Sequence, residues 1–196
     1  MLSDRMNPLF VPIIKMDRET NPNCLLLRHR EMMRLEEVLL EDDYFDLHSN
    51  IVSFMEKLVE GVERLHNLGI VVNSLNLQTI WVDLETMHPL LLLPNSMTKK
   101  GNEVVRSNKL NYIPPEHLEY KANQVPFESA KDDDVYALGI VYYSLLTKNL
   151  PFDIHSMNFE SILHTPIRFN EHFFELDATI IQNTIVILKY RMDIST

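Results

Sequence analysis

The chain has 196 residues, with 28 acidic and 18 basic side chains and a formal net charge of -10. An acidic chain without a dense basic stripe is a poor partner for nucleic acid. It has only four glycines, at positions 61, 69, 101 and 139. Because these lie so far apart, neither G-x-G-x-x-G nor G-x-x-x-x-G-K-[ST] occurs, which excludes two well-known phosphate-binding loops.

The apolar stretches, the N-terminus and the cysteine content indicate in which compartment the protein resides. No apolar stretch reaches the roughly 18 residues that a membrane span needs. The N-terminus lacks a basic region followed by an apolar core, so it does not read as a secretory signal. Cys24 is the only cysteine and cannot form an internal disulfide. We therefore expect no membrane span and an intracellular, cytoplasmic protein.

The first elements along the chain are two short strands and a short helix. Strand-forming residues at 10–15 and 24–27 flank a polar turn that contains Pro22. Residues 34–40 follow as a short amphipathic helix, which the acidic run 41–43 ends. That run could hold a metal, but without a loop glycine a solvated turn is the favoured interpretation.

Residues 51–68 show the clearest helical periodicity, with apolar side chains on one face. Ser49 or Asn50 can cap this helix, and Gly69 ends it. Three short β-like segments at 70–72, 79–82 and 90–93 then predict a small sheet. The polar stretch 95–111 has no periodicity and predicts an exposed loop.

Residues 134–147 predict a helix that is buried on most sides, because it has no wholly polar face. The three carboxylates at 132–134 suit its N-terminus, where the helix dipole favours negative charge. A metal site built from these carboxylates is the alternative. Another mostly apolar helix is predicted at 178–188.

Four motifs occur in a characteristic order: L-H-N-L-G-I-V at 65–71, P-P-E at 114–116, D-V-Y-A-L-G at 134–139 and L-P-F at 150–152. Their order and spacing resemble the large lobe of eukaryotic protein kinases. The resemblance extends from about residue 10 to 196 and implies an α+β, mostly α-helical fold. Residues 1–30 would be a small-lobe remnant, with strands four and five and the hinge. Residues 31–196 would be the large lobe without the family's final helix.

The residues that carry kinase chemistry are changed. The family's catalytic loop reads H-R-D-L-x-x-x-N, and the matching positions hold Val72, Asn73, Ser74 and, for the metal-binding asparagine, Thr79. Ser74 is uncharged near neutral pH and cannot replace the aspartate that accepts the substrate proton. Thr79 is a poor Mg²⁺ ligand. The D-F-G position falls within 93–96, where Asn95 offers only a neutral group.

On this resemblance, the glycine-rich loop, the strand-three lysine and its glutamate partner have no counterpart. The resemblance therefore implies an inactive kinase-like protein, or pseudokinase, with no ATP or Mg²⁺ cofactor.

The residues that carry the family's architecture are retained. Pro115 and Glu116 match the end of A-P-E, and Arg191 matches the arginine that pairs with this glutamate. Asp134 matches the aspartate that binds the catalytic-loop backbone. Gly139 matches a position of close helix contact.

These features predict a protein-binding, scaffolding or regulatory module. Its partners would be other proteins, including an active kinase or a second copy at the open strand edge. One alternative is an atypical Ser/Thr protein kinase completed by a missing small lobe or a second chain. Another is a truncated, non-functional gene product. The candidate interaction residues are Cys24, Leu25 and Leu27 on the strand edge, and Lys99, Lys100 and Arg106 in the polar loop.

Overall fold

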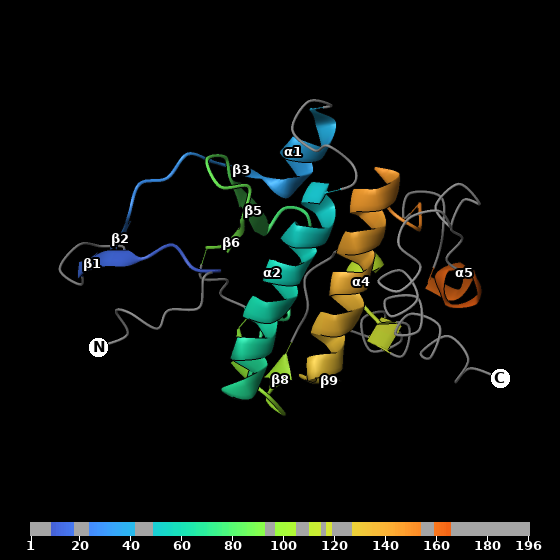
Figure 1. Cartoon of the computed structure of the whole chain (residues 1–196). Coiled ribbons are helices and arrows are strands. Elements are labelled where there is room, and N and C mark those ends of the chain that lie inside the picture. Colours follow the sequence, from blue (N-terminus) through green and yellow to red (C-terminus); the bar gives the residue numbers. More distant parts are fainter. Residues whose placement is uncertain are drawn as a thin grey trace.

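The computed structural model describes residues 9–17, 24–41, 49–92, 97–104, 110–114, 117–118, 127–153 and 159–165. Two long helices form its centre and pack side by side (Figure 1): α2 (Ser49–Asn67) and α4 (Lys131–Thr147). The shorter helical elements are α1 (Leu35–Leu40), α5 (Phe159–His164) and the 3-10 helix η1 (Leu110–Tyr112).

The described strands form small antiparallel sheets. A three-stranded sheet has the order β3-β5-β6, made by β3 (Met32–Arg34), β5 (Ile80–Asp83) and β6 (Pro89–Leu91). The two-stranded sheets pair β1 (Ile13–Asp17) with β2 (Cys24–Leu27), β4 (Ile70–Val71) with β7 (Thr98–Lys99), and β8 (Glu103–Val104) with β9 (Phe127–Glu128).

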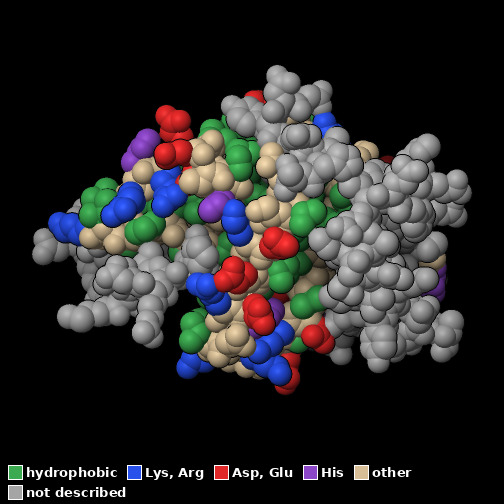
Figure 2. Space-filling view, viewed as in Figure 1, with side chains coloured by type: hydrophobic (Ala, Val, Ile, Leu, Met, Phe, Trp, Pro, Cys, Tyr) green, Lys and Arg blue, Asp and Glu red, His purple; other side chains and the backbone are tan. Residues whose placement is uncertain are grey.

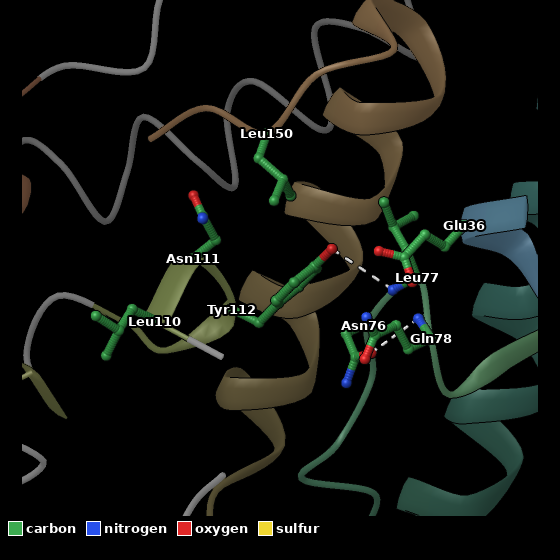
Figure 3. Close-up of a pocket in the computed structure, with 8 residues that line it drawn as sticks. All are labelled: Glu36, Asn76, Leu77, Gln78, Leu110, Asn111, Tyr112 and Leu150. Carbon is green, nitrogen blue, oxygen red and sulfur yellow. Dashed lines mark hydrogen bonds between the residues drawn. The ribbon is translucent and has the colours of Figure 1, made fainter. Parts of the chain in front are cut away.

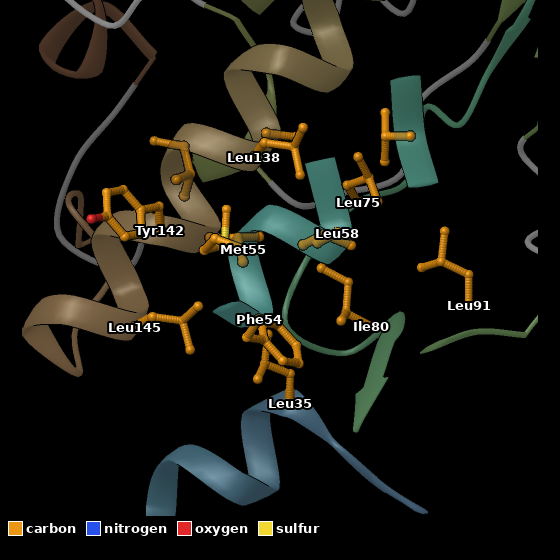
Figure 4. Packing of buried hydrophobic residues seen from close by; sticks show 14 of the residues in the cluster. Leu35, Phe54, Met55, Leu58, Leu75, Ile80, Leu91, Leu138, Tyr142 and Leu145 are labelled. Carbon is orange, nitrogen blue, oxygen red and sulfur yellow. The ribbon is translucent and has the colours of Figure 1, made fainter. Parts of the chain in front are cut away.

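The hydrophobic core lies between α2, α4 and the three-stranded sheet. The apolar residues of α2 at helical spacing are all buried: Ile51, Phe54, Met55, Leu58, Val62 and Leu65. Figure 4 shows Phe54 surrounded by Leu35 of α1, Ile80 of β5 and Leu145 of α4. Helix α2 is amphipathic because only one of its faces packs against the core. Helix α4 is apolar on most sides because it lies deeper in that core and α2 covers one side of it.

The N-terminal segment is attached to this core before it forms the hairpin. Leu9 is 1% exposed, and its carbonyl accepts a hydrogen bond from the Leu91 N–H of β6. Phe10 forms an isolated parallel bridge with Leu91. The β1–β2 hairpin then extends away from the two long helices (Figure 1).

The three helices predicted within the described residues are present, although α2 begins at Ser49 rather than at residue 51 and α4 at Lys131 rather than at residue 134. The predictions for the short strands agree less well. Strand β1 begins at Ile13 rather than at residue 10, because Phe10 pairs with β6 instead. Segment 70–72 does not join the other two predicted strands, since β4 pairs with β7. Strand β3 was not predicted, because three residues are too few to show alternation.

The prediction of a loop without regular structure at 95–111 is wrong for the part of it that the structure describes, although residues 99–102 are exposed as predicted. Strands β7 and β8 and the helix η1 lie within it, and Asn111 is buried. Two-residue strands leave no periodicity in the sequence, because distant partners stabilise them. The predicted helix at 178–188 and the acidic residues 42–43 lie outside the described residues.

In the portion of the chain that the structure covers, every helix is too short or too polar to cross a membrane.

Replacing Phe54 by Ala is expected to lower the free energy of unfolding by about 3–5 kcal/mol, because removing a buried aromatic side chain leaves a cavity. The matched control is Val59→Ala in the same helix, whose side chain is exposed. This control should change the free energy by less than about 0.5 kcal/mol. Urea unfolding followed by circular dichroism measures both, and equal losses would contradict the burial of this face of α2.

Candidate functional site

The loop between β4 and β5, residues 72–79, occupies the position of the predicted catalytic loop. Asp134, at 0% exposure in the first turns of α4, accepts hydrogen bonds from the backbone N–H groups of Val72 (2.7 Å) and Asn73 (2.8 Å). His66 Nε2 of α2 lies 2.8 Å from the same carboxylate. These backbone contacts are those that the kinase resemblance implied for Asp134, and they fix the start of the loop to both long helices.

Asn73 connects this loop to two other segments. Its backbone has a φ of 60°, in the left-handed region that asparagine tolerates better than most residues. The side-chain amide donates to the Val71 carbonyl (3.2 Å) and to Thr98 Oγ1 of β7 (3.0 Å). Its oxygen accepts from Ser129 Oγ (2.8 Å). A neutral side chain thus joins the loop to β7 and to the segment before α4.

The remainder of the loop is held by its own hydrogen bonds. Thr79 Oγ1 donates to the Ser74 carbonyl, and the Asn76 side-chain amide donates to the same carbonyl at 2.9 Å. Asn76 Oδ1 accepts from the Gln78 N–H at 2.9 Å. The Thr79 hydroxyl is therefore directed at loop backbone.

Residues 72–79 contain no acidic side chain. Without a carboxylate, the loop has neither the proton acceptor of kinase chemistry nor the hard anionic oxygens that bind Mg²⁺ well. Among the described residues, no group of three or more His, Cys, Asp or Glu side chains is placed to hold a metal ion. What the loop can offer chemically is neutral hydrogen bonding.

A pocket of about 80 Å³ lies beside this loop (Figure 3). Its volume is small against the roughly 300–1,000 Å³ of typical ligand pockets, so it fits a side chain rather than a nucleotide. The loop, α1, η1 and the residues after α4 all contribute to its lining, which consists of Glu36, Asn76, Leu77, Gln78, Leu110, Asn111, Tyr112 and Leu150.

Tyr112 and Asn111 fix one wall of this pocket. Burial raises the pKa of Tyr112 to about 12; the Leu77 N–H, which donates to the phenol oxygen, opposes this rise, and nearby Glu36 adds to it. The phenol is therefore protonated at neutral pH. The Asn111 amide donates to the Phe152 carbonyl and accepts from the Phe152 N–H, both at 3.1 Å.

A second polar cluster, which the sequence analysis missed, connects the predicted hinge to the β5–β6 turn. Arg30 forms an ion pair with Asp83, which also accepts from the N–H groups of Glu85 and Thr86, each at 3.1 Å. Burial raises the pKa of Asp83, but these hydrogen bonds, Arg30's first, outweigh it and hold the pKa below its usual value.

His88 and Lys57 lie beside this ion pair. Lys57 Nζ is 2.5 Å from His88 Nε2. Burial lowers the pKa of His88, and the positive charges of Lys57 and Arg30 lower it further, against the opposing charge of Asp83. The sequence shows only an arginine in the predicted hinge and an aspartate at the end of a strand. Neither residue indicates that the other is its partner.

The other predicted site residues are spread over α4, β7 and β2, or lie outside the described residues. Gly139 is buried within α4, and Lys99 and Lys100 are exposed at the end of β7. Leu27 is half-buried at the end of β2, the strand that also contains Cys24 and Leu25. Five predicted residues lie outside the described part of the chain, so the Glu116–Arg191 ion pair stays a prediction: Asn95, Arg106, Pro115, Glu116 and Arg191.

No known family profile matches the chain. In sequence it is 26% identical over 167 residues to the serine/threonine-protein kinase PSK1 of Saccharomyces cerevisiae, covering 72% of this chain and 12% of that protein. It is 28% identical over 166 residues to Tribbles homolog 1 of Mus musculus, covering 72% of this chain and 44% of that protein. The chain thus spans less than half the length of either relative.

In structure the chain resembles the kinase PK-1 of Cydia pomonella granulovirus. The TM-score is 0.74 at 20% sequence identity, and the match covers 97% of this chain and 70% of the viral one. This likeness shows that the fold is that of a protein kinase.

The ion pair between Arg30 and Asp83 predicts a pH-dependent stability. Because the folded-state pKa of Asp83 is lowered, its contribution is present above the unfolded-state pKa of about 3.9 and is lost as the pH falls through the folded-state value. Asp83→Asn should therefore destabilise the protein at pH 6, and the difference from wild type should shrink below about pH 4.

Urea unfolding at a series of pH values measures this difference. The control is Asp132→Asn, an exposed carboxyl whose loss changes the formal charge equally. A difference that is constant down to pH 2 would contradict the ionised pair.

Proposed function

Since the chain belongs to the protein kinase superfamily, we propose for it a role that keeps the kinase fold without phosphoryl transfer. In this role it is a pseudokinase that binds other proteins as a scaffolding or regulatory module. The single observation that carries the proposal is Ser74. It stands two residues beyond Val72, whose N–H is held by Asp134, where the family has its catalytic aspartate.

The loop geometry supports this proposal. A positioned general base contributes about 10²- to 10⁴-fold to a rate, and Ser74 has no charge with which to act as one. The Thr79 hydroxyl, at the position of the metal-binding asparagine, is bonded to the loop backbone. Both losses affect one catalytic unit, so their effects are not summed.

The proposed binding role requires neither ATP nor Mg²⁺. The pocket beside the loop accommodates a side chain of a partner protein, with the Glu36 carboxylate and the Leu150 side chain in its lining (Figure 3). Of the two relatives, PSK1 is named a serine/threonine-protein kinase, whereas the name of Tribbles homolog 1 does not mention a kinase.

The β1–β2 hairpin offers a second surface for partners. Ile14 is 61% exposed and Leu26 is 57% exposed. A two-stranded sheet alone is only marginally stable in water, and open apolar edges tend to acquire a further strand. Within the described residues, no third strand pairs with this hairpin. The partner at this edge would be an active kinase or a second copy.

The same hairpin favours an alternative, an atypical Ser/Thr protein kinase whose small lobe is completed by further sequence or by a second chain. Even then Ser74 would stand in place of the catalytic aspartate. The remaining alternative, a truncated product without function, predicts a non-cooperative melt. The unfolding experiments on Phe54 therefore also test that alternative.

Purified protein incubated with Mg·ATP and casein should transfer no phosphate above a heat-inactivated sample. Mg·ATP should raise the melting temperature by less than about 1 °C, because a nucleotide without a site does not stabilise the folded state. Radiolabel transfer and thermal shift measure the two effects. Clear turnover that Ser74→Ala or Asn95→Ala abolishes would contradict the proposal.

If the open edge pairs with a second copy, wild-type protein should associate as its concentration rises. The double variant Ile14→Lys, Leu26→Lys should remain monomeric, since charge on the edge opposes pairing. Leu40→Lys, at an exposed leucine outside the hairpin, should associate like wild type. Sedimentation velocity decides the matter, and a wild-type monomer at all concentrations would remove the second copy as the partner.

A further inference from the structure

A small basic and apolar surface lies where the end of α2 meets β7. Leu68, just after α2, is 75% exposed, and Lys99 and Lys100 are both exposed. The Lys100 N–H donates to the Gly69 carbonyl at 2.9 Å, and Lys99 pairs with Ile70 in the β4–β7 register. The leucine and the two lysines are therefore neighbours in the fold. We call these three residues the Leu68–Lys100 surface.

The charge of this surface contrasts with that of the whole chain. The formal net charge is -10, yet in the described part of the chain neither lysine lies within ion-pair distance of a carboxylate. The nearby Arg64 is already paired with Glu60. In Figure 2, Lys and Arg side chains lie close to a hydrophobic side chain at the lower end of the molecule, where α2 terminates in Figure 1, and Asp and Glu side chains also lie at this end.

The backbone beneath the surface is fastened on two sides by neutral hydrogen bonds. On one side the Asn73 amide donates to Thr98 Oγ1, next to Lys99. On the other side the Gly101 N–H donates to the Ser129 carbonyl at 2.9 Å, while Ser129 Oγ donates to Asn73 Oδ1 at 2.8 Å. A closed circuit of uncharged groups therefore fixes the segment that carries both lysines.

We propose that the Leu68–Lys100 surface is a docking site for an acidic segment of another protein, and that Asn73 holds this site in its binding shape. The proposal rests on the proposed binding role of the chain. The lysines supply charge complementarity, and Leu68 supplies an apolar contact for a side chain between the acidic residues. A site held by neutral bonds is present before the partner arrives, which reduces the ordering cost of binding. An anionic membrane is disfavoured as the ligand, because a bilayer would extend beyond this small surface and face the acidic charge of the remainder of the protein, which a short segment need not contact.

The test uses a fluorescein-labelled peptide of glutamate and leucine residues, with an uncharged serine–leucine peptide of equal length as its counterpart. Fluorescence anisotropy should show binding of the glutamate peptide only, and the affinity should fall as salt is added. The double variant Lys99→Glu, Lys100→Glu should weaken binding about tenfold or more, since like charges then face each other. Lys15→Glu, Arg28→Glu makes the same change in net charge on the hairpin and should leave the affinity within about twofold.

Equal losses in the two double variants would overturn the proposal, because binding would then follow net charge alone. Absence of peptide binding would overturn it as well. So would binding of the wild type to phosphatidylserine vesicles with none to the peptide, which would indicate a membrane ligand. These binding measurements need no nucleotide, so their failure can be distinguished from a failure of the phosphate-transfer test of the proposed function.

The role of Asn73 has its own readout. Asn73→Ala should increase hydrogen exchange at the amides of residues 98–101 and weaken peptide binding, whereas Asn149→Ala, at an exposed asparagine after α4, should do neither. If Asn73→Ala does not fold, Thr98→Val removes only the accepting hydroxyl of the same bond. Unchanged exchange and unchanged affinity in the folded variant would show that Asn73 does not hold the site.

Discussion

The buried carboxylate of Asp134 is the constraint on which the rest of the molecule depends. A fully buried charge is costly unless hydrogen bonds and opposite partial charges surround it. Here two backbone N–H groups of the loop, His66 of α2 and the first turns of α4 provide these partners. Any displacement of α4, α2 or the loop relative to the others leaves part of this carboxylate unsatisfied. The contact therefore fixes the three elements together.

This constraint explains how the loop can be held in place whatever side chains it carries. Asp134 binds backbone N–H groups, which are the same whatever side chains the loop carries. The side chains at 73, 76 and 79 are then free to bond the loop to itself and to β7. The contacts of Asp134 thus hold the loop backbone independently of the side chains at these positions.

The sequence predicted the elements whose signals are local. The helix α2 and its buried face follow from a 3.6-residue apolar period, and the positive φ of Gly69 suits the end of that helix. The short strands β7 and β8 could not be predicted, because two residues carry no period and their partners lie far away in the chain. The ion pair between Arg30 and Asp83 joins residues 53 positions apart, so spacing alone could not reveal it.

For the candidate site, the sequence identified the altered loop positions but not what those residues do. Asn73 could be read as a missing arginine, since the resemblance supplies the expected residue. Its three side-chain bonds depend on where Thr98 and Ser129 are brought by the β4–β7 pairing and by the start of α4. A resemblance can therefore show which residue the family has at a position, whereas the contacts of the residue that is present have to come from the tertiary structure.

The hinge cluster around Arg30 and Asp83 and the side-chain bonds of Asn73 differ in which conditions weaken them. The hinge cluster consists of ionisable groups, with Arg30 and Asp83 paired and His88 kept neutral by burial and by two cations. Its strength therefore depends on pH and on salt. The side-chain hydrogen bonds of Asn73 to Val71, Thr98 and Ser129 join amide, hydroxyl and backbone groups, which do not titrate near neutral pH. The side-chain bonds between the loop and β7 are therefore less sensitive to pH than the hinge cluster is.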